Sequence, residues 1–485
     1  MTQVRATGAR TTRISALAAY AAPGVPEAML LYCAALVIPG FYATEMGLST
    51  RVIGTSMVVA RMFDAAIDPV IGYLSDRCAH LWGGRKPWLA AGAIVSSVAV
   101  AFLYAPHKGI GAGYYLGWTI CLYFGWTMAI IPYDAWGADI SSEYLERTRI
   151  FTYRATAYYL GSLLFLVSPF LGVSRDASFN ADVLHFNAQL VAVLFLITVP
   201  IAFWLGPRGR TGRARSPVDF WGILTNVRHN RPMLVFLLSY SISGISLGVF
   251  LALSYIYVVS YLKLPQAFPV ILLSYAVANL LSVPVWLRII RRIGKHRAWA
   301  LGVFGDALIY PFLAPLTPGP ASYIPALVLI TISGFADAVS RVASDAILGD
   351  IVDFDELRTG KNRAANYYAL KSLVTKGNIA LGGGFAFLLI SLFGYEPAAP
   401  SNSSWGAFGL LLTLLFIPAA LYVVSGLLMW RFPIDRRRQD IIRRRLDARV
   451  LRQGIREDAA LPCGTLTSRM ATLPRSLADA SRDRI

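Results

Sequence analysis

The sequence predicts an all-α integral membrane protein with twelve transmembrane helices arranged as two six-helix bundles. The composition supports this class, because 56% of the 485 residues are hydrophobic and 15% are charged, too few for several soluble domains. Apolar stretches long enough to cross about 30 Å of hydrocarbon recur from end to end. Short motifs also repeat at a near-constant offset, which divides the chain into two similar halves.

Twelve stretches account for the predicted helices. They run over residues 14–42, 50–75, 88–106, 112–139, 150–172, 185–206, 233–260, 267–290, 298–315, 322–350, 364–393 and 405–430. The first is longer than a signal-peptide core, so we expect it to be retained. The predicted organisation is an N-terminal segment (1–13), an N-terminal bundle (14–206), a linker (207–232), a C-terminal bundle (233–430) and a basic tail (431–485).

Positive charge is concentrated on one side of this topology. The connections after even-numbered helices and the tail carry clusters of Lys and Arg, whereas the other connections together carry only four basic residues, namely Arg51, Lys108, Arg175 and Lys263. The positive-inside rule therefore predicts that both termini are cytoplasmic, in a plasma membrane or, in a bacterium, the inner membrane. The net charge of +18 then reflects topology and contact with anionic lipid rather than nucleic-acid binding.

The repeat consists of three motifs that recur in the same order in both halves. The pairs are Gly84–Gly92 with Gly294–Gly302, Asp134–Ile140 with Asp345–Ile351, and Arg154–Tyr159 with Arg363–Tyr368. A parallel repeat of six helices plus six helices is typical of secondary transporters, whose substrate site lies at the membrane midplane between the halves. We therefore expect a small-molecule solute as the partner and a monomeric protein.

The predicted helix 50–75 carries two carboxylates, Asp64 and Asp68, one helical turn apart on the same face. An acidic side chain at mid-membrane costs about 2.5–3.5 kcal/mol even on the lenient insertion scale. Two of them on one face indicate a site for something positive, either Na⁺ held by oxygen ligands or a shared proton. The alternative is that Arg61, three residues before Asp64, neutralises a structural pair.

Further charged and aromatic residues within the predicted helices are candidates for the substrate site. Pro23, Gly24 and Pro26 interrupt the first helix, where Glu27 and Tyr32 would face a cavity. Lys376 has no acidic neighbour on its own helix, which predicts a partner in the other half, from among Asp64, Asp68 and Asp134. Trp126 and Tyr133 would stack on a sugar ring, with helix packing as the alternative. Asp337 and Arg341, one turn apart, most simply satisfy one another.

Charged residues at the cytoplasmic helix ends form a candidate gate. The residues are Asp76, Arg77, Arg85, Lys86, Asp139 and Asp350. Ion pairs between helices at this surface would hold it closed and would break when it opens. Ordinary flanking charge is the alternative.

Enzymatic chemistry is not expected. The five histidines fall in or beside predicted loops, so we expect no buried imidazole to act as a base. A phosphate-binding loop followed by Lys and Ser or Thr is absent from the sequence, which argues against a nucleotide-driven pump. We therefore predict no cofactor, and energy supplied by a Na⁺ or H⁺ gradient.

Several motifs together resemble one family. They are the Arg61–Pro69 pattern, Gly84–Trp88, Ile131–Tyr133, Arg147–Arg154, Leu348–Asp353, and Gly360 through Arg363 to Lys376. Over about residues 20–430 the chain resembles the glycoside–pentoside–hexuronide:cation symporters, the melibiose-permease-like group of the major facilitator superfamily. The resemblance implies that superfamily's fold and a cation site at Asp64 and Asp68 with Thr127 as a further ligand. It also implies that Arg154 and Lys376 lie beside the substrate.

The family's sugar-binding pattern is incompletely kept. Its first sugar-gripping Asp is replaced by Ala28, with Glu27 adjacent, its second falls at Ile130, and its stacking Trp falls at Asp134. The resemblance therefore does not identify the solute. The eukaryotic sodium–lysophospholipid symporters share much of the pattern as well.

The function predicted is cation-coupled symport of a glycoside or oligosaccharide-type solute by alternating access. Symport of a lysolipid-like amphiphile is the alternative within transport. A non-transporting membrane sensor built on the same fold is a less favoured alternative, since a sensor need not bear the cost of intramembrane carboxylates.

Overall fold

The computed structural model describes residues 12–78, 84–107, 109–141, 144–207, 230–360 and 363–459. All regular elements in these ranges are helices. The first half contains α1 (Ile14–Ala21), α2 (Gly24–Leu36), α3 (Ile38–Thr44), α4 (Thr50–Arg77), α5 (Lys86–Leu103), α6 (Ala112–Ile140), α7 (Tyr144–Val167), η1 (Ser168–Phe170) and α8 (Ala181–Leu205). The second half contains α10 (Arg231–Tyr255), η2 (Ile256–Tyr261), α11 (Ala267–Ile293), α12 (Lys295–Ile309), η3 (Tyr310–Leu313), η4 (Pro320–Ser322), α13 (Tyr323–Thr359), α14 (Ala364–Leu392), α15 (Ser404–Leu411), η5 (Leu412–Phe416), α16 (Ile417–Trp430) and α17 (Arg436–Ala459).

These elements make twelve long helical segments in the described residues, six before the 207–232 region and six after it, followed by α17. Ten segments are long and apolar enough to cross a membrane by length and composition. The other two are α4, whose middle carries Arg61, Asp64 and Asp68, and α12 with η3, which carries Lys295, Arg297 and Asp306. The helix with the candidate cation site is thus one of two segments whose charged residues weaken their apolar character.

Three predicted boundaries differ from the structure. The first segment is divided into α1, α2 and α3, with breaks at Ala22–Pro23 and at Val37. The helix predicted from residue 150 begins at Tyr144, and α13 continues to Thr359 instead of ending at residue 350. Both extensions are polar helical turns that run beyond the apolar stretch.

His296 is buried at the first turn of α12, so the expectation that no imidazole is buried is wrong.

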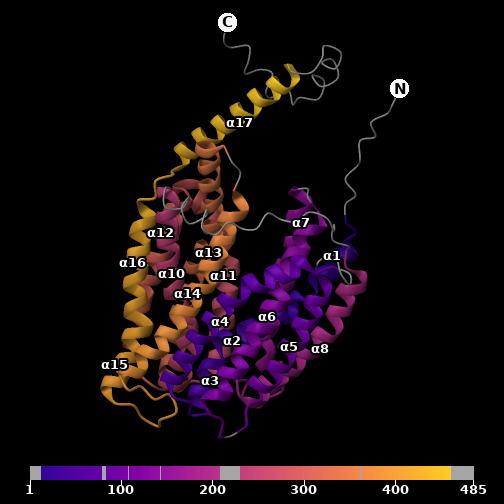
Figure 1. Cartoon of the computed structure of the whole chain (residues 1–485). Coiled ribbons are helices and arrows are strands. Elements are labelled where there is room, and N and C mark those ends of the chain that lie inside the picture. The colour runs from indigo at the N-terminus through magenta and orange to yellow at the C-terminus, as the bar shows by residue number, and fades with distance from the viewer. Residues whose placement is uncertain are drawn as a thin grey trace.

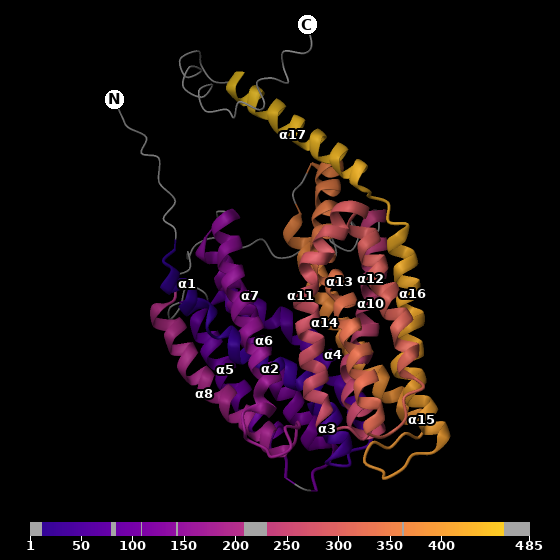
Figure 2. The ribbon, with the colours of Figure 1, turned by 180° about the vertical axis from the view of Figure 1, so that it is seen from behind.

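The helices pack as two groups that meet along a narrow line. In the first half α6 packs on α4 and α5, and α7 packs on α2; in the second half α10 packs on α14, and α13 packs on α11 and α12. Contacts between the halves join α4 to α14, α7 to α11, and α2 to α10. The halves come together at the end where α3 and α15 lie, while α7 and α13 diverge toward the end where α17 lies (Figures 1 and 2).

The sequence repeat reappears as a pair of equivalent ion pairs. Arg85 Nε lies 2.9 Å from Asp139 Oδ2 in the first half. Lys295, the repeat counterpart of Arg85, lies 2.6 Å from Asp350 Oδ2, and Asp350 is the counterpart of Asp139. Each bridge ties the start of one helix, α5 or α12, to the following long helix, α6 or α13. The two halves therefore stabilise the same helix pair in the same way.

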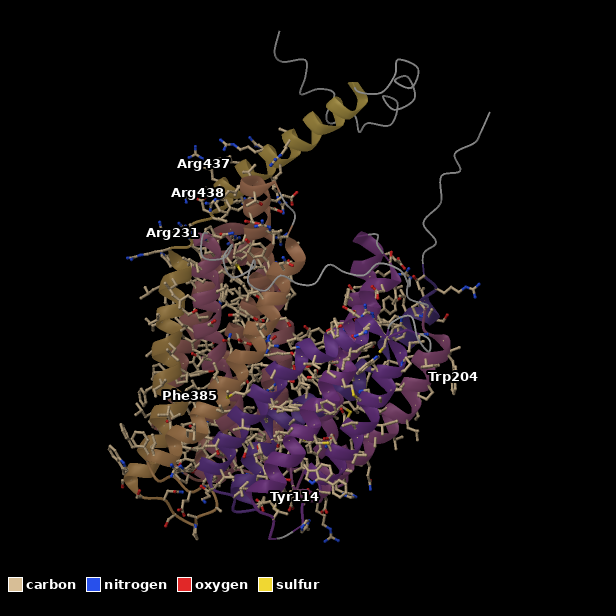
Figure 3. The ribbon with its side chains drawn as sticks, viewed as in Figure 1. Tyr114, Trp204, Arg231, Phe385, Arg437 and Arg438 are labelled. Carbon is tan, nitrogen blue, oxygen red and sulfur yellow. The ribbon has the colours of Figure 1, made fainter. Side chains whose placement is uncertain are left out.

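The outer surface separates apolar flanks from a basic end. Large apolar side chains such as Trp204 and Phe385 are exposed on the flanks, while Arg231, Arg437 and Arg438 lie at the end where α7 and α13 diverge (Figure 3). At that end α17 packs against α13, and Arg443 Nε lies 3.5 Å from Asp353 Oδ2. Residues 1–11 of the predicted N-terminal segment, 208–229 of the linker and 460–485 of the tail lie outside the described residues.

Glycines allow the two halves to approach closely at the opposite end. A Cβ atom placed on Gly54 of α4 would lie 2.9 Å from the carbonyl oxygen of Gly384 on α14. A Cβ on Gly40 of α3 would lie 2.9 Å from the Cβ of Tyr255 on α10. Small residues at such crossings let helix backbones pack directly in a membrane. The contact is specific to the arrangement in which this end is shut.

Replacing Gly54 by leucine should therefore favour the arrangement in which the end at α3 and α15 is open and the end at α7 and α13 is closed. Overpacking of this kind costs about 1–3 kcal/mol in the arrangement that contains it, and the obstacle here is backbone rather than a flexible side chain. Spin labels at the exposed helix ends Arg77 and Arg292, in a variant whose four cysteines are replaced by serine, report the separation of the halves. We expect the measured distance to shorten in Gly54→Leu.

Gly117→Leu is the matched control, because nothing lies within 4 Å of a Cβ on Gly117. That variant should give the parental distance. Equal distances in Gly54→Leu and the parent would show that the α4–α14 contact does not control the separation of the halves.

Candidate functional site

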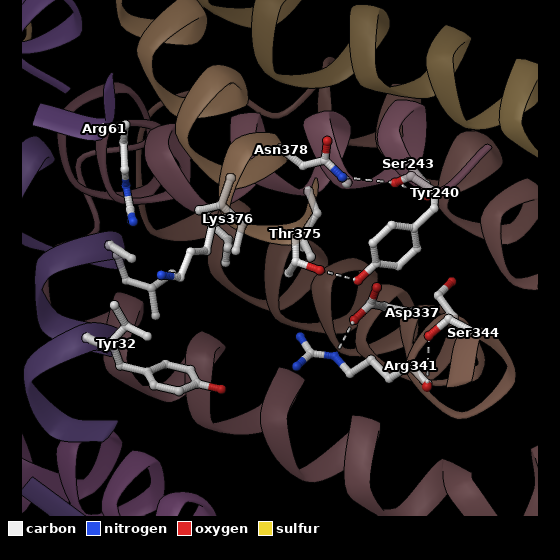
Figure 4. Close-up of a pocket in the computed structure, with 18 of the residues that line it drawn as sticks. Tyr32, Arg61, Tyr240, Ser243, Asp337, Arg341, Ser344, Thr375, Lys376 and Asn378 are labelled. Atoms are coloured by element: carbon white, nitrogen blue, oxygen red, sulfur yellow. Dashed lines mark hydrogen bonds and ion pairs between the residues drawn. The ribbon is translucent and has the colours of Figure 1, made fainter. Parts of the chain in front are cut away.

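A cavity of about 390 Å³ lies between the two halves. The first half contributes side chains from α2, α4, α6 and α7, and the second half contributes side chains from α10, α12, α13, α14 and α16. The lining combines the aromatic residues Tyr32, Trp126, Tyr158, Tyr240, Trp299 and Tyr422 with the charged residues Arg61, Asp337, Arg341 and Lys376. Figure 4 shows Lys376, Arg341 and Tyr32 around this space. The cavity therefore offers aromatic faces and charged groups from both halves to one occupant.

The two carboxylates of α4 share one hydroxyl donor. Thr127 Oγ1 of α6 lies 2.6 Å from Asp64 Oδ1 and 3.1 Å from Asp68 Oδ1. Asp64 is 2% exposed and Thr127 is fully buried. Their spacing of one helical turn, with the α4–α6 packing, brings three oxygen-bearing side chains together. Such oxygens suit a hard cation or a proton, and among the described residues no group of three or more His, Cys, Asp or Glu side chains suggests a transition-metal site.

Two basic side chains occupy the other carboxylate oxygens. Lys376 Nζ of α14 lies 2.6 Å from Asp68 Oδ2 and 4.8 Å from the centre of the Trp126 ring. Arg61 lies 3.3 Å from Asp64 Oδ2 and stacks over the ring of Tyr123 at 4.0 Å. The Lys376–Asp68 ion pair joins the two halves. Because Lys376 also lines the cavity, the same ammonium touches both the carboxylate pair and the space for a solute.

Four of the residues predicted at the substrate form a separate cluster in the first half. Arg154 of α7 lies 3.7 Å from Glu27 of α2, forms an ion pair with Asp134 of α6, and stacks over Tyr133 at 4.2 Å. The hydroxyl of Tyr133 donates to the backbone carbonyl of Tyr20. None of these four side chains belongs to the lining of the cavity, whereas Tyr32, Trp126 and Lys376 do. The cluster holds α1, α2, α6 and α7 together.

Sequence reasoning missed most of the second half's contribution to the cavity. The missed polar and aromatic residues are Tyr240, Ser243, Trp299, Ser340, Ser344, Thr375 and Asn378. The sequence indicates Arg341 only as a partner of Asp337, yet the Arg341 side chain is 49% exposed. Its Nε lies 3.3 Å from Asp337 Oδ2, which leaves the terminal nitrogens directed into the cavity (Figure 4). The spacing of residues 337, 340, 341 and 344 is a signal that they share one helix face.

The predicted gate residues make their contacts within one half. Arg85 bridges Asp76 at 2.6 Å and Asp139 at 2.9 Å, and Arg77 NH1 lies 3.3 Å from the hydroxyl of Tyr73. Lys86 donates to the backbone carbonyls of Phe203 and Gly206, and Asp350 pairs with Lys295. These contacts fix the helix ends of each half at the end where the halves diverge. Their role as a gate between the halves stays a prediction.

The Arg154 cluster makes a testable contribution to stability. Removing one partner of a buried ion pair leaves an uncompensated charge and costs about 3–5 kcal/mol, and Glu27 is buried. Arg154→Leu should therefore lower the midpoint of thermal unfolding in detergent strongly, and adding Glu27→Gln should restore part of the loss.

Arg443→Leu is the control for this prediction. Arg443 lies 3.5 Å from Asp353, and both side chains are more exposed than those of Arg154 and Glu27, so its loss should cost no more than about 1 kcal/mol. Similar melting points for Arg443→Leu and Arg154→Leu would contradict a stabilising role for the buried cluster.

Comparison with solved structures places this geometry within a known fold. The structure matches the crystal structure of the nucleoside transporter NupG with a TM-score of 0.63 at 13% sequence identity, covering 87% of this chain and 99% of that one. At this identity the likeness shows the fold alone, and that helical fold agrees with the fold that the sequence predicted.

Sequence relatives include carriers of two kinds. The glucuronide carrier protein homolog of Escherichia coli (strain K12) is 24% identical over 420 residues, covering 84% of this chain and 90% of the relative. The sodium-dependent lysophosphatidylcholine symporter 1-A of Danio rerio is 22% identical over 442 residues, covering 83% and 82%. A family model described as MFS/sugar transport protein matches residues 19–436. The chain therefore belongs to the MFS/sugar transport family of membrane transporters, and it is not an enzyme.

Proposed function

We propose that the protein is a cation-coupled symporter of a glycoside-type solute that works by alternating access. The observation that carries the proposal is the position of Lys376, which contacts Asp68 of the carboxylate pair and also lines the central cavity. A single side chain in both places gives cation binding and solute binding a common element. Such a shared element is what a coupling free energy between two sites requires.

The coupling follows from competition for one carboxylate. Na⁺ or a proton that binds between Asp64 and Asp68, with Thr127 as a further oxygen, competes with the ammonium of Lys376 for Asp68. The released ammonium then donates hydrogen bonds to the solute in the cavity. Solute binding in turn keeps Lys376 away from Asp68, so each bound species favours the other.

Aromatic and hydroxyl groups of the cavity support a sugar-like cargo. Trp126 and Tyr240 line the cavity with aromatic rings of the kind on which a pyranose ring stacks, and Ser243 and Asn378 add polar groups to the lining. A volume of about 390 Å³ lies within the usual range for small-ligand sites. The similarity to a glucuronide carrier homolog agrees with this cargo class.

A lysolipid-like amphiphile is the second candidate cargo. Leu31, Leu36, Leu247 and Leu251 make part of the lining apolar, and a lysophosphatidylcholine symporter is among the relatives. Uptake into vesicles, with imposed Na⁺ or H⁺ gradients and a panel of oligosaccharides, uronides and lysolipids, distinguishes the two. If only lysolipids accumulate, the glycoside proposal is wrong and the cargo is a lysolipid-like amphiphile.

The membrane orientation is part of the proposal. The end at which α7 and α13 diverge is also the end rich in Arg and Lys (Figure 3), and the positive-inside rule assigns such an end to the cytoplasm. We infer that the protein acts as a monomer in a plasma or bacterial inner membrane, with its cavity open to the cytoplasm in this arrangement. The charged helix ends would form the cytoplasmic gate when the halves close.

Loss of either carboxylate should uncouple transport. Asp64→Asn and Asp68→Asn each remove an ionised ligand for the driving cation, so gradient-driven accumulation should fall to background while solute exchange continues. The measurement is uptake of the best panel substrate into vesicles with and without the gradient. Asp176→Asn, an exposed loop substitution, should accumulate normally, and normal accumulation in both α4 variants would rule out the proposed cation site.

Lys376→Ala tests the coupling element separately. Without the ammonium, the cation no longer competes for Asp68, so cation affinity should hold or rise. The effect of the cation on solute affinity should fall by roughly 5–150-fold, the usual range of a coupling factor. Solute titrations at zero and saturating cation measure it, with Lys263→Ala as a loop control. If the ratio of solute affinities at saturating and zero cation is the same in Lys376→Ala and the wild type, Lys376 has only a structural role.

A further inference from the structure

Asp306 is a buried carboxyl group that the proposed transport cycle does not use. It lies on α12, is 1% exposed, and accepts a hydrogen bond of 2.7 Å from Ser333 Oγ of α13. Among the described residues it has no ion pair within 4.0 Å, unlike Asp64, Asp68 and Asp337. A hydroxyl is thus its only recorded hydrogen-bond partner in the part of the chain that the structure describes.

The groups that face Asp306 from the neighbouring elements offer no positive charge. They are Asp337 from α13, Tyr275 from α11, Tyr310 from η3 and Tyr422 from α16. An ionised carboxylate in such surroundings would bear the desolvation cost of burial and repulsion from Asp337. The neutral acid bears neither. The surroundings of Asp306 therefore favour the carboxyl with a proton bound.

One face of α13 runs from the Ser333 partner of Asp306 to the central cavity. Ser333, Asp337 and Arg341 follow one another at four-residue spacing on one face of α13. Asp337 Oδ2 accepts from the Tyr275 hydroxyl at 2.9 Å and lies 3.3 Å from Arg341 Nε. Asp337, Arg341 and Tyr422 line the cavity, and Figure 4 shows the Arg341 guanidinium between Asp337 and the Tyr32 side.

We propose that Asp306 is a proton-binding site in the second half, distinct from the Asp64–Asp68 pair, and that it acts on the cavity through Asp337 and Arg341. The proton comes from water and returns to water, so the step changes no other bond. When Asp306 loses its proton, its negative charge adds to that of Asp337, which is the ion-pair partner of Arg341. Arg341 is then drawn toward the two carboxylates and away from the solute, so the protonated form is the one that presents Arg341 to the cavity.

Infrared spectroscopy tests the proposal without a transport substrate. The full chain in lipid nanodiscs should show the C=O stretch of a protonated carboxyl near neutral pH, and Asp306→Asn should remove that band. Asp182→Asn, an exposed carboxyl at the start of α8, should leave it. Ser333→Ala keeps the acid but removes its hydrogen bond, so the band should remain and shift to higher frequency. The Ser333 variant keeps the test valid where Asp306→Asn does not fold.

Titration of the same band tests its link to the cavity. We expect the band to disappear reversibly as the pH is raised. Asp337→Asn removes the neighbouring negative charge and leaves Arg341 unpaired, so the transition should move to lower pH by about one unit, a tenfold loss of proton affinity. A band that never titrates, that Asp306→Asn leaves intact, or that Asp337→Asn does not shift would overturn the proposal. Because no transport is measured, this failure is distinguishable from failure of the proposed symport.

Discussion

The ion pair between Lys376 and Asp68 joins the two halves of the molecule beside the central cavity. It crosses from α14 to α4 at 2.6 Å, and it requires the backbones of these helices to approach closely. Gly54 and Gly384 permit that approach. A partly buried ion pair contributes little net stability, because desolvation offsets most of the attraction. The pair instead links two sites, since any species that competes for Asp68 changes what Lys376 can bind.

Each half is held together by ion pairs of its own. Arg85 with Asp139 and Lys295 with Asp350 tie equivalent helices in the two halves, and Arg154 with Glu27 ties α7 to α2. Charge therefore makes each half rigid at the end where the halves diverge. The interface between the halves relies on glycine contacts at the other end. Rigid halves joined by a narrow, small-residue interface are suited to rocking as units.

The sequence predicted local features better than it predicted the cavity. Asp64 and Asp68 are one turn apart on one helix, so their proximity follows from helical geometry. The direction of Arg341 depends on α10, α13 and α14 packing around a common space, which local spacing does not encode. Arg154 shows the converse, because the expected substrate contact is occupied by Glu27 and Asp134 of its own half. Helix ends were missed where α7 and α13 continue as polar turns beyond the apolar stretch.

The acids Asp64 and Asp68 of the first half differ from Asp306 of the second half in their partners. Asp64 and Asp68 are each paired with a basic side chain and share Thr127, so an incoming cation must displace an existing partner. Asp306 has a hydroxyl partner and an acidic neighbour, Asp337, so its charge state must be set by proton binding. In a low-dielectric interior a change of one charge is felt by every group nearby. Under the two proposals, the Asp64–Asp68 pair acts on the cavity through Lys376 and Asp306 acts on it through Arg341, so a solute in the cavity would lie between two basic groups whose availability depends on separate ions.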